Sequence, residues 1–322
     1  MRWVRALCAM TLVLAMVGCQ FIPASETMAP ANTVVITPQM AQTRESTRTV
    51  SLYYRFRGED RLARETREIT LPNDRRLDEI LITMLLDGPA ASQSERVGLF
   101  PPGTRLISIT QRNGVVFVTL SREFLGTPAD MPINWQDNRT LQEEVLLRRR
   151  LGAYAIINTL AENAGAQSMQ LLIQLDGESQ GIPRTEFYRE ERDDGVLLGP
   201  ITREESMILT HYYAADALLT AWCDKNWVRL YRYITLGPPT GDAFTQEMDM
   251  WPISLLSYLV TPGCVSADGT KAYLTVYLDL IDWNGSRQSD AQAMLTLVLQ
   301  NDVWKIEYES LRQLPETVTT RY

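Results

Sequence analysis

Apolar residues in this chain recur with two different periods, and the order of those periods restricts the fold class. A period of 3.6 residues predicts helices at 77–88, 140–165 and 204–223, with short strands of period two between them. From residue 271 to 308 the chain changes to long alternating strands. This order predicts an α+β protein of two domains: a small sheet with helices on one face, then a curved sheet that forms a cone with its helices first.

Turn and cap residues give the clearest local signals. Asn113-Gly114 lies between two β-rich segments and predicts a tight hairpin. Capping boxes that begin at Thr140 and Thr202 predict the first turns of two helices, and Gly165 predicts the end of the first. Asp176-Gly177 is read as a turn after a half-buried strand.

The first twenty residues have the pattern of an export signal. Arg2 and Arg5 precede an apolar stretch at 6–18, which is too short to span a bilayer. A Met-Val-Gly segment then leads into Cys19, and this resembles a bacterial lipobox. The resemblance implies cleavage between Gly18 and Cys19 and a lipid, with acyl chains such as palmitate, on the Cys19 thiol. The alternatives are an uncleaved anchor helix or an ordinary signal cut nearby.

These patterns divide the chain into six segments. Residues 20–47 are rich in Pro, Thr, Ser, Ala and Gln and have no apolar periodicity, which is typical of a flexible tether. The expected segments are 1–18 signal peptide, 19–47 tether, 48–192 first domain, 193–203 linker, 204–314 cone-shaped domain and 315–322 tail.

Composition excludes several classes of function. The chain has a net charge of −8, and loss of Arg2 and Arg5 with the signal leaves 29 basic against 39 acidic residues, a net −10. Such a surface repels polyphosphates, so nucleic acid is not expected as a partner and membrane attachment must come from the lipid. His211 is the only histidine, which removes most zinc sites. No metal or cofactor is expected.

Two cysteines remain after the signal and the lipid site are set aside. Cys223 and Cys264 could pair outside the cytoplasm. Each also lies in an apolar stretch, where a buried free thiol is equally ordinary. Both alternatives stay open from the sequence.

Residues 50–190 resemble a GerMN domain. The residues that carry the resemblance follow the predicted elements in order: Leu86-Asp87-Gly88-Pro89, Phe100-Pro101-Pro102-Gly103-Thr104, Leu120-Ser121-Arg122-Glu123-Phe124 and Leu175-Asp176-Gly177. The resemblance implies a ring-building module of an envelope machine, of the kind found on lipoproteins of spore-forming and related bacteria. It also implies no catalytic residues.

Residues 204–312 resemble the cone-shaped fold of the nuclear transport factor superfamily. Trp222, Trp227 and the closing Val303-Trp304-Lys305-Ile306 carry this resemblance. The fold hosts both enzymes and binding modules, so it does not by itself choose a function.

Four residues of the second domain are candidates for the mouth of a cone: Tyr212, Asp216, Tyr277 and Asp279. A carboxylate buried there could act as a general base. The favoured alternative is that the aromatic rings fill the core and the Asp side chains face water. Ser121 lacks the flanking glycines of a nucleophile elbow and is read as a turn or cap hydroxyl. Arg148-Arg149-Arg150 is read as the solvated side of a helix, with contact to an acidic partner as the alternative.

The sequence therefore predicts an extracytoplasmic protein, lipid-anchored to the cytoplasmic membrane, that acts without catalysis. It would bind envelope proteins or copies of itself, in sporulation or a cell-wall process, and no catalytic residue is assigned. The alternative is a module that binds a small ligand or wall fragment in the cone. A third interpretation is an enzyme with Asp216 or Asp279 as base. Interaction predicts an exposed docking face on residues 50–190.

Overall fold

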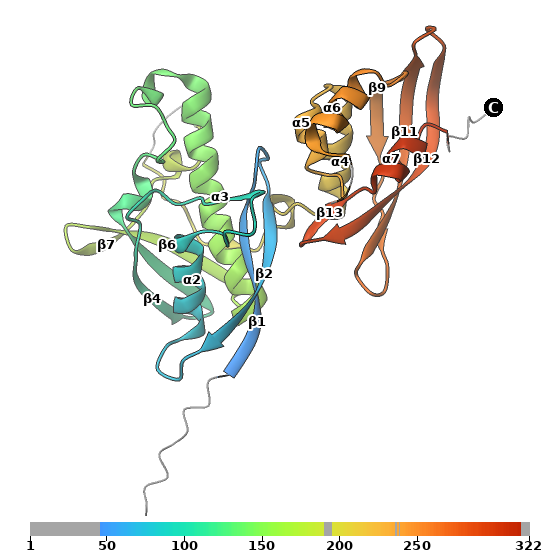
Figure 1. The fold of residues 1–322 in the computed structure, drawn as a ribbon. Coiled ribbons are helices and arrows are strands. Elements are labelled where there is room, and N and C mark those ends of the chain that lie inside the picture. The colour runs from blue at the N-terminus through green and yellow to red at the C-terminus, as the bar shows by residue number, and fades with distance from the viewer. Residues whose placement is uncertain (1–45, 190–194, 236, 238, 317–322) are drawn as a thin grey trace, which may run out of the picture. The chain divides into compact units, whose positions relative to one another are not determined.

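The computed structural model describes residues 46–189, 195–235, 237 and 239–316. The predicted signal peptide, the lipid site at Cys19, nearly all of the tether and most of the tail lie outside the described residues. The architecture is α+β, as the sequence predicts, with three sheets and helices packed against them (Figure 1). We call residues 46–202 the first lobe and residues 203–316 the second lobe.

A three-stranded sheet opens the first lobe, with strand order β2-β1-β3. Its members are β1 (Ser46–Phe56), β2 (Leu62–Leu71) and β3 (Arg96–Val97). Strands β1 and β2 form a hairpin, in antiparallel register from Ser46–Leu71 to Arg55–Leu62. Gly58 takes the positive φ that its turn requires.

A second sheet of the first lobe has the order β4-β5-β6-β7, with β8 also paired to β6. Its strands are β4 (Leu106–Arg112), β5 (Val115–Ser121), β6 (Ser168–Leu175), β7 (Glu178–Gly181) and β8 (Ile201–Thr202). Asn113 and Gly114 both have positive φ, which confirms the predicted tight hairpin. Strands β5 and β6 are parallel, and the chain between them crosses over through a long helix.

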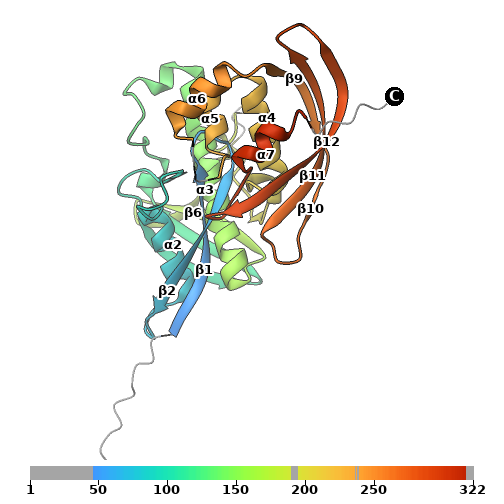
Figure 2. The same cartoon turned by 45° about the vertical axis from the view of Figure 1, so that its right-hand side comes forward.

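Two helices cover one face of this second sheet. They are α2 (Leu77–Asp87) and α3 (Arg139–Ala164), and both also contact β1 (Figures 1 and 2). Val116, Val118 and Leu120 point toward the helices from β5, and Leu171 and Ile173 from β6. Burial of these side chains between helix and sheet supplies most of the stabilisation of the lobe.

Two details of the first lobe differ from the prediction. The N-cap of α3 is Asn138, whose side-chain oxygen accepts from the backbone N–H groups of Thr140 and Leu141, so the predicted cap at Thr140 lies two residues late. Gly165 ends the helix in the left-handed conformation, as predicted. Part of the predicted 193–203 linker instead joins the sheet, because Ile201 and Thr202 pair with β6.

The second lobe is built on one curved sheet. Its strands run in the order β10-β11-β12-β13, and β9 pairs with β11. The bounds are β9 (Ile253–Val260), β10 (Cys264–Val265), β11 (Lys271–Asp282), β12 (Arg287–Gln300) and β13 (Val303–Lys305). Gly285, Asn301 and Asp302 all have positive φ in the turns that flank β12.

Four helices accompany this sheet, and α4 packs on its concave side (Figure 1). They are α4 (His211–Cys223), α5 (Trp227–Tyr231), α6 (Gly241–Asp249) and α7 (Tyr308–Gln313). Short 3-10 helices elsewhere span Arg122–Leu125, Trp135–Asp137, Arg184–Glu186 and Glu205–Met207. Trp222, Tyr233 and Phe244 are among the fully buried side chains, so the interior of the cone is filled by protein.

Two helix boundaries of the second lobe correct the prediction. The capping box at Thr202 does not begin the α-helix, because α4 starts only at His211 and Glu204 caps a 3-10 turn. Tyr308 continues the apolar alternation of Trp304 and Ile306, yet it begins α7 and does not extend the last strand.

The tip of the β1–β2 hairpin packs against the second lobe. Phe56 lies 5.5 Å from Tyr233 between ring centroids, and it belongs to the same buried cluster. Glu59 accepts two hydrogen bonds of 2.7 Å from the Arg229 guanidinium. Among the described residues, no helix is both long and apolar enough to cross a membrane.

Candidate functional site

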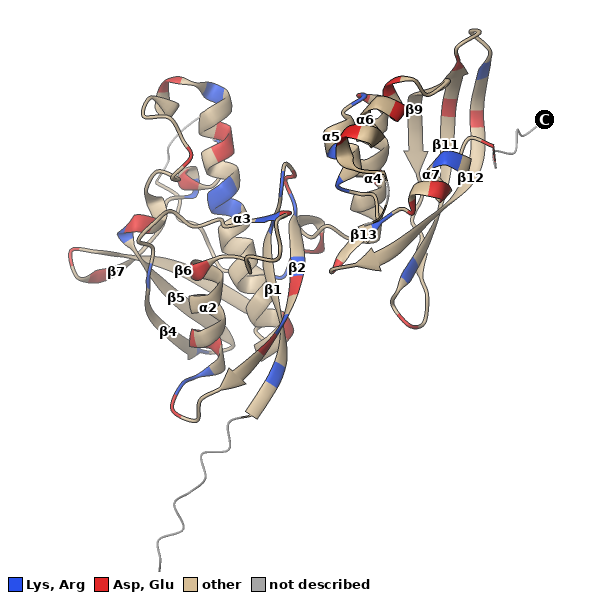
Figure 3. Ribbon diagram, viewed as in Figure 1, with Lys and Arg blue, Asp and Glu red and all other residues tan. Residues whose placement is uncertain are grey.

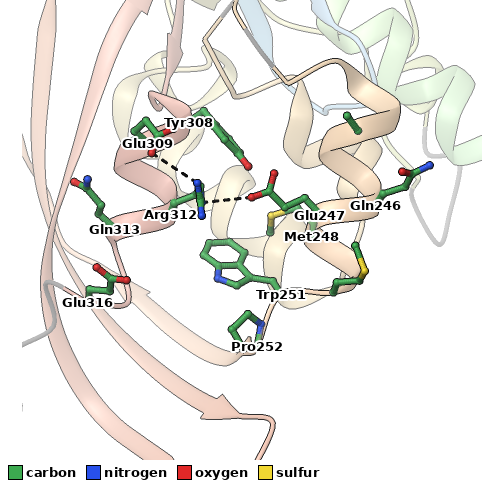
Figure 4. Close-up of a pocket in the computed structure, with 12 residues that line it drawn as sticks. Gln246, Glu247, Met248, Trp251, Pro252, Tyr308, Glu309, Arg312, Gln313 and Glu316 are labelled. Carbon is green, nitrogen blue, oxygen red and sulfur yellow. Dashed lines mark ion pairs between the residues drawn. The ribbon is translucent and has the colours of Figure 1, made fainter.

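A cavity of about 640 Å³ lies between α6 and α7 in the second lobe. Figure 4 shows Glu247 and Arg312 directed toward each other across it, with Trp251 below them. The turn that follows α6 supplies Met250, Trp251 and Pro252 to its wall. This volume is within the range of pockets that hold small molecules.

The local sequence explains how this cavity is framed. Phe244 and Met248 are four residues apart on α6 and both point into the core, which turns Glu247 toward α7. Trp251 follows the helix and stacks on Trp222, with ring centroids 5.2 Å apart and planes 3° apart. The stacked indoles fix the wall of the cavity.

The charges around the cavity are predominantly acidic. Arg312 lies 3.4 Å from Glu247 and 4.0 Å from Glu309, while Glu316 adds a third carboxylate. Burial, with a smaller contribution from the nearby Glu247 carboxylate, raises the pKa of Tyr308 to about 12. The cavity therefore combines aromatic surface with surplus negative charge, which suits a ligand that carries hydroxyl or ammonium groups.

The four residues considered as candidates for a cone mouth lie apart in the second lobe. The Asp216 carboxylate, on α4, accepts a hydrogen bond of 2.9 Å from the Tyr258 hydroxyl on the inner side of the sheet. Tyr277 and Asp279 alternate with buried residues of β11 and so lie on its outer side. Tyr212 packs at the edge of the core.

Asp279 has a structural environment of its own. Its carboxylate accepts from the backbone N–H of Asp290 and the hydroxyl of Ser257, at 2.9 Å and 2.7 Å. These bonds, and the nearby Arg287 guanidinium, lower the pKa of Asp279. The residue lies at a register shift between β11 and its neighbours, where it holds the irregular strand in place.

Both remaining cysteines are free thiols. The Cys223 thiol donates to the Leu256 carbonyl at 3.2 Å, and Cys264 is exposed on β10. The pairing considered from the sequence is not formed in the structure. Burial raises the pKa of the Cys223 thiol, which keeps it protonated.

Ser121 and the arginine run have their partners within the first lobe. The Ser121 hydroxyl is buried and accepts from the backbone N–H of Arg105 at 3.0 Å. Arg148 pairs with Asp130 and Glu144. Arg149 is buried and pairs with Glu186.

The prediction of a solvated arginine face is therefore wrong at these positions. Figure 3 shows acidic and basic residues along the first half of α3, and this spacing accounts for the Arg148–Glu144 pair, whereas Asp130 and Glu186 reach Arg148 and Arg149 from outside the helix. Arg150 lies over the Tyr188 ring, 5.2 Å from its centroid. His211, at the start of α4, has an edge-on contact with Trp304, and burial lowers its pKa.

The outer face of the β4–β7 sheet is a second candidate surface. A depression of about 390 Å³ lies there, away from α2 and α3, around the half-buried side chains of Phe117 and Leu172. Ser108, Thr110 and Thr119 surround them, and Arg112 is the one charged residue that lines it. This is a shallow surface with few charges.

One protein-family model matches most of the first lobe. Residues 51–180 match the Germane family model. That family is described as one of sporulation and spore germination. We call this matched segment the Germane domain. It contains all of α2 and α3 and the strands from β4 to β6. No protein among the curated ones matches the chain significantly.

Several solved structures are similar to part of this chain. The tandem GerMN domains of the sporulation protein GerM from Bacillus subtilis are 17% identical, with 51% of this chain and 46% of that chain covered and a TM-score of 0.33. This chain therefore spans a little under half the length of that protein. A candidate lipoprotein from Clostridium perfringens is 19% identical over 50% of this chain and 90% of that one, with a TM-score of 0.27.

A third solved structure covers a smaller share of this chain. It is a Nostoc punctiforme protein of unknown function with a cystatin-like fold, 10% identical over 29% of this chain and 84% of that one, with a TM-score of 0.21. The Germane domain is thus the part of the chain for which the comparisons supply a family.

Sequence reasoning did not find the cavity of the second lobe. Glu247 and Arg312 lie 65 residues apart, on two helices that the apolar pattern did not reveal. The i and i+4 spacing of Phe244 and Met248 is the one signal that predicts α6. Among the described residues no group of three or more His, Cys, Asp or Glu could hold a metal ion.

Proposed function

We propose that this protein is an extracytoplasmic lipoprotein that acts without catalysis, by binding another envelope protein or a second copy of itself through its Germane domain. The family match supports a link to sporulation, spore germination or a related envelope process. The lipobox-like segment at Cys19 supports attachment to the membrane from outside the cytoplasm.

The outer face of the β4–β7 sheet carries this proposal. Both helices of the Germane domain pack on the opposite face, so Phe117 and Leu172 stay half-buried at the surface. Cores of protein interfaces are depleted in charge and contain aromatic anchors. In a chain with 70 charged residues among 322, a face lined mainly by apolar and hydroxyl side chains fits that description.

A charge placed in the centre of this face tests the proposal. Phe117→Lys and Leu172→Lys should abolish self-association in sedimentation experiments, or crosslinking to an envelope partner in membranes, while circular dichroism stays unchanged. Val228→Lys is the matched control, because Val228 is an exposed apolar residue of α5 in the second lobe. Association that is equally strong in all three variants would contradict a docking role for the sheet.

The membrane anchor needs a separate test. Cys19→Ala should move the protein from the membrane to the soluble fraction of the envelope, because no thiol is left to carry the lipid. Cys264→Ala, which removes an exposed thiol elsewhere, is the control. A Cys19→Ala protein that stays with the membrane would exclude this anchor.

The acidic cavity of the second lobe favours a second candidate function, the binding of a small ligand such as a wall fragment. Its aromatic and carboxylate lining can contact the sugar rings and amino groups of a soluble muropeptide. Trp251→Ala and Glu247→Gln should each weaken muropeptide binding in an NMR titration. A wild-type protein whose Trp251 signal does not shift at millimolar muropeptide would exclude this candidate.

A further inference from the structure

A smaller cavity, of about 200 Å³, has the opposite charge. It lies beside β13 and is lined by residues 92–96, by Arg232 and by Lys305. Three of its charged residues are basic, Arg96, Arg232 and Lys305, and one is acidic, Glu95. In a chain with a net charge of −8, this local surplus of two positive charges is unusual.

Lys305 is the residue that most needs an explanation. Its side chain is only 7% exposed. Among the described residues, its ammonium has neither a hydrogen-bond acceptor nor an ion-pair partner within 4 Å. A lysine is rarely buried this far unless it is paired, because desolvation of an unpaired ammonium is costly. Burial lowers the pKa of Lys305, and the Arg96 guanidinium acts in the same direction against the opposing Glu95 carboxylate.

The two arginines are held in place by uncharged acceptors. Arg96 is 4% exposed and donates to the backbone carbonyls of Arg64 and Asn301. Arg232 donates to the carbonyl of Arg57 at 2.9 Å, and its Nε lies 3.6 Å from Glu95. The carbonyl acceptors orient both guanidinium groups, while the Glu95 carboxylate partly balances the charge of Arg232 and the Glu65 and Asp302 carboxylates act on Arg96.

We propose that this cavity binds a phosphate group, either as inorganic phosphate or as the head of a phosphomonoester. Phosphate carries between one and two negative charges near neutral pH, which matches the surplus of two positive charges, whereas a single carboxylate would leave one cation unbalanced. The hydroxyls of Ser92, Ser94 and Thr235 also line the cavity and can donate to further oxygens. A volume of 200 Å³ holds one tetrahedral anion and a few waters, so the remainder of a phosphomonoester would lie outside the cavity.

Thermal unfolding of the full chain in phosphate-free buffer, at constant ionic strength, tests this site. Inorganic phosphate should raise the wild-type melting temperature in a saturable way, since a ligand that binds only the folded state stabilises it. Lys305→Met should weaken the binding roughly ten- to a hundredfold, as expected when a charge-assisted contact is lost. Lys271→Met, at an exposed end of β11, should keep the wild-type response.

A second ligand and a second variant distinguish the sources of the phosphate and control for a folding defect. Glycerol phosphate that raises the melting temperature as strongly as inorganic phosphate shows that an ester is accepted, and a weaker response assigns the site to free phosphate. Arg232→Gln removes the partly exposed arginine and should also weaken binding. A wild-type protein without a saturable response, an equal response to acetate, or a Lys305→Met protein that responds like wild type would overturn the proposal.

Discussion

Charged side chains at the two ends of the second lobe differ in how far they are buried. At the end that receives the β1–β2 hairpin, Glu59 and Lys305 are 5% and 7% exposed. At the α6–α7 cavity, the side chains of Glu247 and Arg312 are 46% and 52% exposed. Arg229 and Arg232 at the first end are 25% and 22% exposed, so the charges there are less exposed than those at the α6–α7 cavity. Burial therefore decides which of these charges the fold depends on.

The geometry of the ion pairs follows the same division. Glu59 accepts from both Nε and Nη2 of Arg229, each at 2.7 Å, which is the bidentate arrangement typical of strong pairs. Arg312 meets Glu247 at 3.4 Å and is shared with Glu309. Pairs of the second kind are largely screened by solvent.

The largest expected effect is the loss of the buried pair. Glu59→Gln should lower the free energy of unfolding by about 3 kcal/mol, because Arg229 would keep its charge without a counter-ion in a mostly buried place. Urea denaturation followed by tryptophan fluorescence measures this loss. Glu143→Gln is the matched control, since the Arg139–Glu143 pair is exposed and should contribute less than about 1 kcal/mol.

A double variant tests whether the Glu59–Arg229 ion pair itself accounts for the lost stability. Glu59→Gln combined with Arg229→Met removes both charges and should recover part of the lost stability. If the double variant is as unstable as the sum of the single variants, the hairpin tip is held by packing of Phe56 and not by the ion pair.

The two ends should also differ in how tyrosine ionisation at alkaline pH affects the free energy of unfolding. Burial, assisted by nearby Glu59, raises the pKa of Tyr233 far above its usual value of 10. The stability from a neutral Tyr233 is complete below pH 10 and is lost as unfolded tyrosine ionises above it, by about 1 kcal/mol between pH 10 and 11. Urea midpoints across this range should fall less in Tyr233→Phe. The pKa of Tyr308, at the open cavity, is raised only to about 12, so Tyr308→Phe should differ from Tyr233→Phe only near and above pH 12, where the folded Tyr308 phenol also ionises.

Lys305 should give a pH dependence of the opposite sign. Its folded pKa is lowered by burial, so the unfolded chain binds more protons between that pKa and about 10.5. Stability from this residue therefore rises with pH within that window. Lys305→Met should remove the rise and be at least as stable at neutral pH. A wild-type curve that matches Lys305→Met from pH 7 to 9.5 would show that Lys305 is not desolvated.

Local chemistry explains which parts of the fold could be predicted from sequence. Asn113-Gly114 and Gly165 predicted their turn and helix end, because each needs a positive φ that few residues accept. The cap at Asn138 was missed because Thr140 and Glu143 also fit a capping box. The sequence alone does not show which of two neighbouring residues caps the helix, because the cap depends on the backbone conformation.

The charged sites could not be predicted, because their partners are distant in sequence. Glu59 and Arg229 are 170 residues apart, and neither stands out from the other charged residues of the chain. Lys305 lies in a strand whose alternation predicts burial, but the alternation does not reveal which charges surround it. Asp216 and Asp279 lie on α4 and on the outer side of β11, and their separation follows from the packing of helix on sheet, which the sequence does not show.

The smallest expected effect is at the open cavity. Glu247→Gln should change the free energy of unfolding by only about 0.5 kcal/mol, because both members of its pair with Arg312 are already well hydrated. The same substitution leaves the stacked Trp222 and Trp251 in place, so the cavity should keep its shape. Urea denaturation in low and high salt measures the change, which salt should reduce further. A loss above about 2 kcal/mol would mean that Glu247 is buried in solution, and the contrast between the two ends of the lobe would then disappear.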